Sequence, residues 1–460
     1  MQGDTIAAIA TAVGVGGIGI VRISGKEALA VADRVFRSKS GMKVSEQPSY
    51  SARYGEVIDS ESGEVIDEAL ALVMRAPRSY TREDVVELHC HGGPLPLSLV
   101  LQTVVKAGAR VAEPGEFTQR AFFNGRIDLA QAEAVCDVIR AQTETSLRLA
   151  QGQLRGLLSQ TAKSLTARLL ELEAWLEVGI DFPEDDIPEL RNEELVVRLQ
   201  SIEKEITQLL ARGQSGRVLR EGLPAVIVGK PNAGKSSLMN ALTGTQRALV
   251  TDIPGTTRDV LEETINVGGV PVRLLDTAGI RETGDLVERL GVEAAKERLD
   301  KAELVLLVLD AERGWEKEDE EILALCHGRN TLVLLNKIDI GTALTVDEVE
   351  ARCHGMRVLP VAAKQGLGLE KLEAAILDFV YGGKVQSSEH IGVSNARHLA
   401  ALEAARANVQ AALATVKAGL GNDLVSSDIR AARLEIGKIS GETVDDAVIE
   451  RIFQDFCIGK

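Results

Sequence analysis

The feature that most constrains this chain is the run G-K-P-N-A-G-K-S at residues 229–236, which has the G-x-x-x-x-G-K-S spacing of a phosphate-binding loop. A short apolar run, 225–228, precedes it and predicts a buried strand, and residues 237–242 predict a helix. This strand–loop–helix context distinguishes a phosphate loop from an ordinary glycine-rich turn. Backbone N–H groups of such a loop surround phosphates at the positive end of the helix. We expect Lys235 to reach the β- and γ-phosphates and Ser236 to hold Mg²⁺.

Strands and helices alternate from about residue 217 to 383, which predicts an inserted Ras-like α/β domain. Its near-continuous apolar runs, 304–309 and 331–335, are typical of parallel strands buried on both faces, so we expect a mostly parallel sheet with helices on both sides. Leucines at helical spacing on either side of this insert predict one all-α helical domain, with a flexible joint at 213–216. The β-rich start predicts an α+β domain. The predicted domains of this multidomain chain are 1–118, 119–216 (helical, first part), 217–383 (inserted) and 384–460 (helical, second part).

Composition narrows the class of protein. The chain has 460 residues and a net charge of −16, which argues against a dedicated nucleic-acid coat protein without excluding a local basic patch. Five scattered cysteines fit a reducing compartment better than a disulfide framework. The chain shows no apolar run of the ~20 residues that a membrane helix needs and no signal peptide, so we expect a cytoplasmic protein without a membrane.

Further motifs follow the phosphate loop in a fixed order. The run D-T-A-G at 276–279 follows a predicted strand, and its Asp276 would hold Mg²⁺ through water. Between the two motifs, 255–259 is predicted to be a switch loop whose Thr257 gives Mg²⁺ a second hydroxyl. The residues of these two loops that we expect at the nucleotide are Thr251, Asp252, Ile253, Pro254, Gly255, Thr256, Thr257, Asp276, Thr277, Ala278 and Gly279, after Asn232, Ala233, Gly234, Lys235, Ser236 and Ser237 of the phosphate loop.

The base predicted for this nucleotide is guanine. The run N-K-I-D at 336–339 follows another strand, and the carboxylate of Asp339 can accept two N–H donors from the Watson–Crick edge of guanine. We expect Asn336 to address the other base edge and the stem of Lys337 to cover the ring. The segment resembles the translation-factor-related GTPases, including Ala362, Ala363 and Lys364, which stand where that family usually reads Ser-Ala-Lys. Ile280 stands where Ras-like proteins carry their water-orienting Gln, so hydrolysis needs another group.

Two other patterns predict no site. Gly14, Gly16 and Gly19 have the G-x-G-x-x-G spacing, but they run into a strand instead of a helix, so we reject a dinucleotide fold. The run H-C-H at 89–91 is interpreted as a strand end turning at Gly92, because a zinc site needs about four ligands and no second cluster is near.

The whole chain resembles the MnmE (TrmE) family of tRNA modification GTPases. The runs that carry the resemblance are D-T-I-A-A at 4–8, G-I-V-R-I-S-G at 19–25, Y-T-R-E-D-V-V-E at 80–87, E-P-G-E-F-T at 113–118, N-G-R-I-D-L-A-Q-A-E at 124–133 and F-C-I-G-K at 456–460. The resemblance implies a GTPase that, with a FAD-containing MnmG partner, installs a carboxymethylaminomethyl or aminomethyl group on carbon 5 of the wobble uridine of certain tRNAs. A 5-formyl or 5,10-methylene tetrahydrofolate would supply the one-carbon unit, and the N-terminal domain would bind it and form a homodimer, within a heterotetramer or larger complex.

The resemblance also assigns roles to residues. It implies folate contacts at Arg22, Glu87, Arg126 and Lys460, and a potassium ion held by Asn232, Thr251, Ile253 and Thr256 in place of an arginine finger. It implies a catalytic carboxylate at Glu288, which would orient the water that the apolar Ile280 cannot. Arg258 and Cys457 are further catalytic candidates. Packing or placement beside the substrate is the favoured role for Cys457, since catalysis needs a lowered thiol pKa.

Two alternatives stay open. A regulatory GTPase switch in ribosome or RNA assembly would need neither the N-terminal folate-like residues nor the C-terminal tail. A folate-dependent transferase would use GTP for regulation only.

Overall fold

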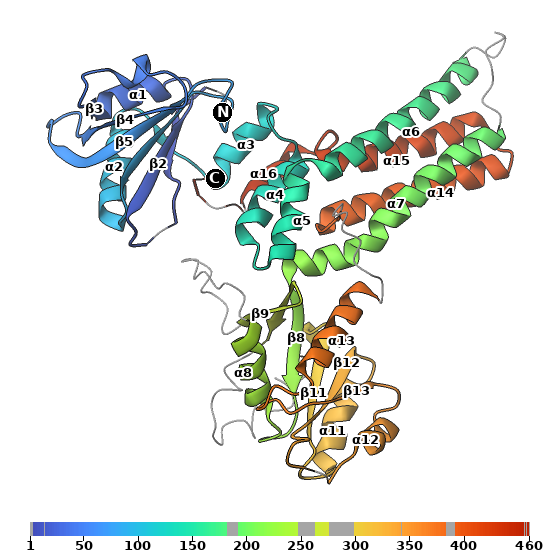
Figure 1. Ribbon diagram of the computed structural model, residues 1–460. Coiled ribbons are helices and arrows are strands. Elements are labelled where there is room, and N and C mark those ends of the chain that lie inside the picture. Colours follow the sequence, from blue (N-terminus) through green and yellow to red (C-terminus); the bar gives the residue numbers. More distant parts are fainter. Residues whose placement is uncertain are drawn as a thin grey trace.

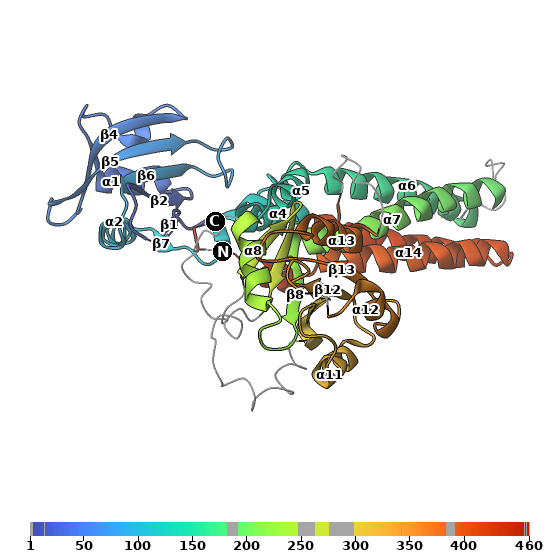
Figure 2. The ribbon, with the colours of Figure 1, turned by 60° about the horizontal axis from the view of Figure 1, so that its bottom comes forward.

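The computed structural model describes residues 3–12, 14–181, 192–246, 263–275, 299–341, 343–382, 392–454, 456 and 458–459. The described chain forms three parts: an N-terminal sheet domain, a long helical bundle, and an α/β domain below the bundle (Figure 1). The two ends of the chain lie near each other beside the N-terminal domain in both views (Figures 1 and 2). Among the described helices, none combines the length and apolarity needed to cross a membrane.

The N-terminal domain is a seven-stranded sheet covered on one face by two helices. Its strand order is β3-β4-β5-β6-β2-β1-β7, antiparallel except for β1 and β7. Val21, Ile23, Val86 and Leu88 alternate along β2 and β6 and are buried against these helices. The elements are β1 Ile6–Ile9, β2 Ile18–Ser24, α1 Ala28–Val35, β3 Phe36–Ser38, the 3-10 turn η1 Val44–Glu46, β4 Ser51–Ile58, β5 Val65–Met74, β6 Val85–His91, α2 Pro94–Lys106 and β7 Arg110–Val111.

The helical domain is built from two stretches of chain that are far apart in sequence. Helices α6 and α7 precede the inserted domain, α14 and α15 follow it, and the four pack side by side in one bundle (Figure 1). The leucines at 158, 165, 169, 172 and 176 are buried in the bundle core, as their spacing predicts. The elements are α3 Glu116–Phe123, α4 Leu129–Arg140, α5 Glu144–Leu154, α6 Leu157–Asp181, α7 Asn192–Glu221, α14 Ala396–Lys417, α15 Asn422–Ser440 and α16 Asp446–Gln454.

The flexible joint predicted at 213–216 is wrong: α7 runs through these residues to Glu221. The two glycines serve close packing instead. A Cβ at Gly213 would lie 2.1 Å from Leu399 Cδ2, and one at Gly216 would lie 2.2 Å from the Val393 carbonyl oxygen. Glycine is therefore required where α7 meets the start of α14, and the boundary predicted at 216/217 falls inside a helix.

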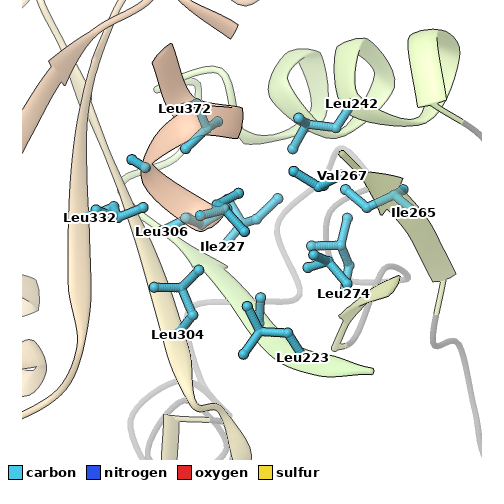
Figure 3. Packing of buried hydrophobic residues seen from close by; sticks show 14 of the residues in the cluster. Leu223, Ile227, Leu242, Ile265, Val267, Leu274, Leu304, Leu306, Leu332 and Leu372 are labelled. Carbon is cyan, nitrogen blue, oxygen red and sulfur yellow. The ribbon is translucent and has the colours of Figure 1, made fainter. Parts of the chain in front are cut away.

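The α/β domain has a six-stranded sheet of order β13-β12-β11-β8-β10-β9, parallel except for β9. Both faces are covered by apolar side chains, as the sequence predicts for its uninterrupted apolar strands. Figure 3 shows one face, where Ile227, Leu274 and Leu306 from the sheet meet Leu242 and Leu372 from helices. The elements are β8 Leu223–Val228, α8 Lys235–Gln246, β9 Glu263–Val267, β10 Val270–Leu274, β11 Leu304–Asp310, α11 Lys317–Cys326, β12 Thr331–Asn336, α12 Val346–Arg352, β13 Arg357–Pro360 and α13 Leu369–Tyr381.

Candidate functional site

The phosphate loop joins β8 to α8, so the predicted strand–loop–helix order is confirmed. Gly229, Asn232 and Gly234 have φ angles of 149, 64 and 100 degrees. Residues other than glycine rarely have a positive φ, although asparagine tolerates the left-handed region in which Asn232 lies. A Cβ at Gly229 would lie 2.3 Å from the Val308 carbonyl oxygen, and one at Gly234 would lie 2.0 Å from Asn336 Nδ2. Both glycines are therefore fixed by conformation and by space.

Lys235 begins α8, and its ammonium group is folded over the loop. Its Nζ donates hydrogen bonds to the carbonyl oxygens of Gly229 at 2.7 Å and Lys230 at 2.8 Å. Burial lowers the pKa of Lys235. Ser236 and Ser237 lie in the same first turn of α8, where the helix dipole and the first N–H groups favour an anion. The arrangement has the parts of a phosphate site.

Asn336 is held by two backbone groups, and its predicted contact with a base edge stays a prediction. It ends β12, is 2% exposed, and donates from Nδ2 to the Ala233 carbonyl oxygen at 2.9 Å. Its Oδ1 accepts from the Ala363 N–H at 3.0 Å. Both ends of the amide are thus engaged with backbone, because the carboxyl end of β12 lies directly beside the phosphate loop. Asn336 is a brace between two loops.

Lys337 and Asp339 follow the end of β12, and their predicted contacts with a base stay predictions. Lys337 has a φ angle of 65 degrees, and its Nζ pairs with Asp310 Oδ2 at 2.6 Å. Asp339 is exposed and accepts a hydrogen bond from Gln365 Nε2 at 2.9 Å. Ala362 and Ala363 are buried beside this loop, while Lys364 is exposed.

Asp310 is a site residue that the sequence analysis missed. It ends β11 in register with Asn336 of β12, so both side chains reach the same edge of the sheet. The signal was present: an acidic residue directly follows the apolar run 304–309, at the carboxyl end of a predicted parallel strand.

Several predicted residues lie outside the described part of the chain, so their predicted roles stay predictions. They are Thr251, Asp252, Ile253, Pro254, Gly255, Thr256, Thr257 and Arg258 of the first switch segment, Asp276, Thr277, Ala278, Gly279 and Glu288 of the second, and Cys457 and Lys460 of the tail.

In the N-terminal domain, Arg22, Glu87 and Arg126 gather around one aromatic ring. Arg22 Nε donates to Glu87 Oε1 at 2.8 Å, across paired positions of β2 and β6. The guanidinium carbon of Arg22 lies 5.6 Å from the ring centre of Tyr80, and that of Arg126 lies 4.7 Å from the same centre. Arg126 also donates to the Tyr80 carbonyl oxygen at 3.0 Å. The three residues, which are far apart in sequence, are therefore neighbours, and Tyr80 is a fourth member of the group that the sequence did not indicate.

The C-terminal tail reaches the same place. Arg22 NH1 donates to the Gly459 carbonyl oxygen at 3.2 Å. Phe453 and Phe456 are buried, so this part of the tail is docked; their rings lie 5.1 Å apart, and the Phe453 ring lies 6.3 Å from that of Phe122 in α3, tilted by 42°. The last residues of the chain thus lie against β2, about 440 positions away in sequence.

The two patterns rejected above have the structure that the rejection predicts. The glycines at 14, 16 and 19 lie between and within two antiparallel strands, β1 and β2. His91 ends β6 and its Nδ1 pairs with Asp67 Oδ1 at 2.7 Å, while His89 Nε2 contacts Glu87 Oε2 at 3.3 Å. Within the described residues, no three His, Cys, Asp or Glu side chains are grouped to hold a metal ion.

Comparison with known proteins covers the whole chain. The family model described as the MnmE helical domain matches residues 129–457, and that described as the GTP-binding protein TrmE N-terminus matches residues 5–126. The chain is 48% identical over 458 residues to the tRNA modification GTPase MnmE of Geobacillus kaustophilus, covering 99% of each chain. It is 48% identical over 462 residues to that of Desulforamulus reducens, covering 100% of each.

Among solved structures, Era of Aquifex aeolicus aligns with a TM-score of 0.28 and 31% identity, over 40% of this chain and 66% of that chain. A TM-score this low leaves the assignment to the family models and to the full-length relatives. On those grounds, the chain belongs to the MnmE family of tRNA modification GTPases.

Proposed function

We propose that this protein is a potassium-dependent GTP hydrolase that modifies carbon 5 of the wobble uridine of certain tRNAs, together with a FAD-containing MnmG-type partner. The main support for GTP binding is the pair of hydrogen bonds made by Asn336, which join the phosphate loop at Ala233 to the base-side loop at Ala363. Phosphate and base contacts are thereby held as one preorganised unit, as selective nucleotide binding requires. The relatives named tRNA modification GTPases support the proposal that the protein acts on tRNA.

Base selection is assigned to Asp339. Its carboxylate is exposed at the end of the N-K-I-D run and is oriented by Gln365. A carboxylate there would accept from guanine, whereas adenine would leave the pairing groups unmatched. Lys337 would cover the base with its stem, because Asp310 holds its ammonium group at the far end.

Mg²⁺ and K⁺ fit the side chains of the phosphate loop. Ser236, in the first turn of α8, would hold Mg²⁺ with Thr257, and Mg²⁺ would neutralise charge on the phosphates. Asn232 puts an amide at the bend of the loop, in a left-handed conformation that Asn tolerates, and amide oxygens suit hard cations. Asn232 would hold K⁺ with Thr251, Thr256 and the Ile253 carbonyl oxygen, and K⁺ would offset charge developing on the phosphates.

The remaining steps of hydrolysis need a water-positioning group. Glu288 is assigned that role, since Ile280 is apolar, and Arg258 is a second candidate in the switch loop. The two G domains of a homodimer would meet during turnover, so hydrolysis would drive opening and closing.

Folate binding is assigned to the cluster around Tyr80. Glu87 offers a largely buried carboxylate for the N–H donors of a pterin edge, and the cations Arg22, Arg126 and Lys460 would serve the glutamate tail. Tyr80 adds an aromatic face between the two arginines. Bound tetrahydrofolate would supply the one-carbon unit for the modification.

The homodimer is assigned to the sheet face opposite α1 and α2. Tyr54 and Leu70 form a cross-strand pair on that face and are 49% and 44% exposed. Leu72, Glu87 and Arg22 are paired in register along the same face, so the apolar area is continuous with the folate cluster. An exposed apolar area beside a polar site is typical of an interface.

The folate assignment is tested by binding of 5-formyltetrahydrofolate to the full chain and its Glu87→Gln variant, measured by calorimetry. Loss of the charged acceptor should weaken binding by about tenfold or more, because hydrogen bonds to charged groups contribute about 1.5–3 kcal/mol. Glu64→Gln, an exposed change before β5 in the same domain, should leave the affinity unchanged. Equal affinity of wild type and Glu87→Gln, or no binding by wild type, would rule the folate site out.

A further inference from the structure

The phosphate loop contains a second lysine, Lys230, whose side chain points away from the phosphate site. It is 4% exposed, and its Nζ lies 2.6 Å from Asp319 Oδ2 and 2.7 Å from Glu316 Oε2. Both carboxylates belong to the N-terminal end of α11, a helix that follows β11. Burial alone would lower the pKa of Lys230, but its hydrogen bonds to Asp319 and Glu316 outweigh burial and raise it. The ammonium group therefore stays charged inside the domain.

The carboxylate of Asp319 is buried against Lys230. It is 2% exposed, and its Oδ2 accepts both from Lys230 and from the Glu316 backbone N–H at 2.9 Å. Its Oδ1 is buried with no hydrogen-bond partner among the described residues. A buried carboxylate with an unsatisfied oxygen is costly unless a cation compensates it. The ion pair between Lys230 and Asp319 therefore fixes the start of α11 to the phosphate loop, because breaking it would leave a buried charge without a partner.

The backbone of Lys230 is held as well. Its carbonyl oxygen accepts from the Nζ of Lys235, the residue assigned to the phosphates. The loop that contains Lys230 has three residues with positive φ, one of them Asn232, and such a conformation persists only where the surroundings impose it. Asn336 holds the second half of the loop at Ala233. Lys230 is the matching attachment for the first half.

We propose that Lys230 is a positioning residue: by clamping the phosphate loop to Asp319 and Glu316 of α11, it sets the place from which Lys235 reaches the phosphates. The proposal rests on the assignment of this loop to GTP. The clamp also links the two ends of the nucleotide site, because the segment from Asp310 to Glu316 connects the partner of Lys337 to the partner of Lys230. Loss of the clamp would weaken the binding of the phosphates and would leave the preference for guanine unchanged.

The test uses the full chain and the dissociation of a fluorescent N-methylanthraniloyl GDP, followed by steady-state hydrolysis of GTP and of ITP. Lys230→Met and Asp319→Asn should each speed dissociation by about tenfold, equal to about 1.4 kcal/mol. KM for GTP should rise more than kcat falls, and the preference for GTP over ITP should stay as in wild type. The double variant should be no worse than Lys230→Met alone, because Lys230→Met already removes the contact between Lys230 and Asp319.

Two further variants separate positioning from general stability. Lys230→Arg retains a cation that can reach both carboxylates and should restore slow dissociation. Arg217→Met breaks another ion pair, between Arg217 of α7 and Glu303 of the α/β domain at 2.7 Å, and should leave dissociation unchanged even if the melting temperature falls. Dissociation within twofold of wild type in both Lys230→Met and Asp319→Asn, or losses that simply add in the double variant, would overturn the proposal. If wild type bound no GTP, the proposed function itself would fail, which is a separate result.

Discussion

At the scale of single residues, the nucleotide site depends on side chains that hold loops in place. Asn336 illustrates this best. Sequence places it in a predicted guanine-binding motif, but motif spacing cannot show that its amide also joins two loops. That role depends on β12 lying near the phosphate loop, about 100 residues away in sequence. Lys230 was missed for the same reason, since its partners Asp319 and Glu316 are distant along the chain.

Asn336→Ala should lower the affinity for GTP by at least about tenfold. The change leaves the Ala233 carbonyl oxygen and the Ala363 N–H without their partner, and each unsatisfied buried group costs about 1–3 kcal/mol. The measurement is GTP binding by calorimetry. Asn330→Ala is the matched control, because Asn330 makes an exposed 3.3 Å contact with the Glu303 carbonyl oxygen. Equal affinities for the two variants would contradict the role of Asn336.

At the scale of elements, strands and helices were predicted well where one period of apolar residues runs without interruption. The bundle leucines and the runs ending in Leu309 and Leu335 are of this kind. The prediction failed at 213–216, because a glycine that permits a turn and a glycine that permits close helix packing look the same in sequence. Only the proximity of Leu399 and Val393 separates them.

A buried ion cluster joins α4 to α14 and predicts a pH dependence of stability. Glu133 accepts from Arg397 Nε at 3.0 Å and contacts His398 Nε2 at 2.8 Å. Burial alone would raise the pKa of Glu133, but these partners hold it at about 2. Burial lowers the pKa of His398 below 6.5, and burial raises that of nearby Asp137, which Arg220 contacts.

Because the folded pKa of Glu133 is depressed, its contribution to stability is present above about pH 4.5 and is lost as pH falls toward 2. His398 has a depressed folded pKa too, so its protonation in the unfolded chain starts to lower stability below about pH 6.5. Denaturant unfolding at several pH values should show this fall, and Glu133→Gln should flatten its acidic part. Glu177→Gln, at an exposed pair, should not. An unchanged slope in Glu133→Gln would contradict the assignment.

At the scale of the whole molecule, direct contacts connect all three parts. A Cβ at Gly269, in the turn of the β9–β10 hairpin, would lie 2.4 Å from Thr145 Oγ1 of α5 in the helical domain. The strands of this hairpin are the direct neighbours, in sequence, of the two predicted switch segments. Close-packed contacts transmit displacement, so a movement of this hairpin would be passed to α5 of the helical domain. The C-terminal tail contacts the N-terminal domain, because the Gly459 carbonyl oxygen accepts a hydrogen bond from Arg22.

The central claim is that the phosphate loop belongs to a GTPase that uses a potassium ion. It is tested most directly by steady-state GTP hydrolysis in potassium and in sodium at equal ionic strength, for wild type and Asn232→Ala. We expect strong stimulation of wild type by potassium and its loss in Asn232→Ala, since Asn232 supplies the amide assigned to the ion. Equal rates of wild type in the two salts would contradict it.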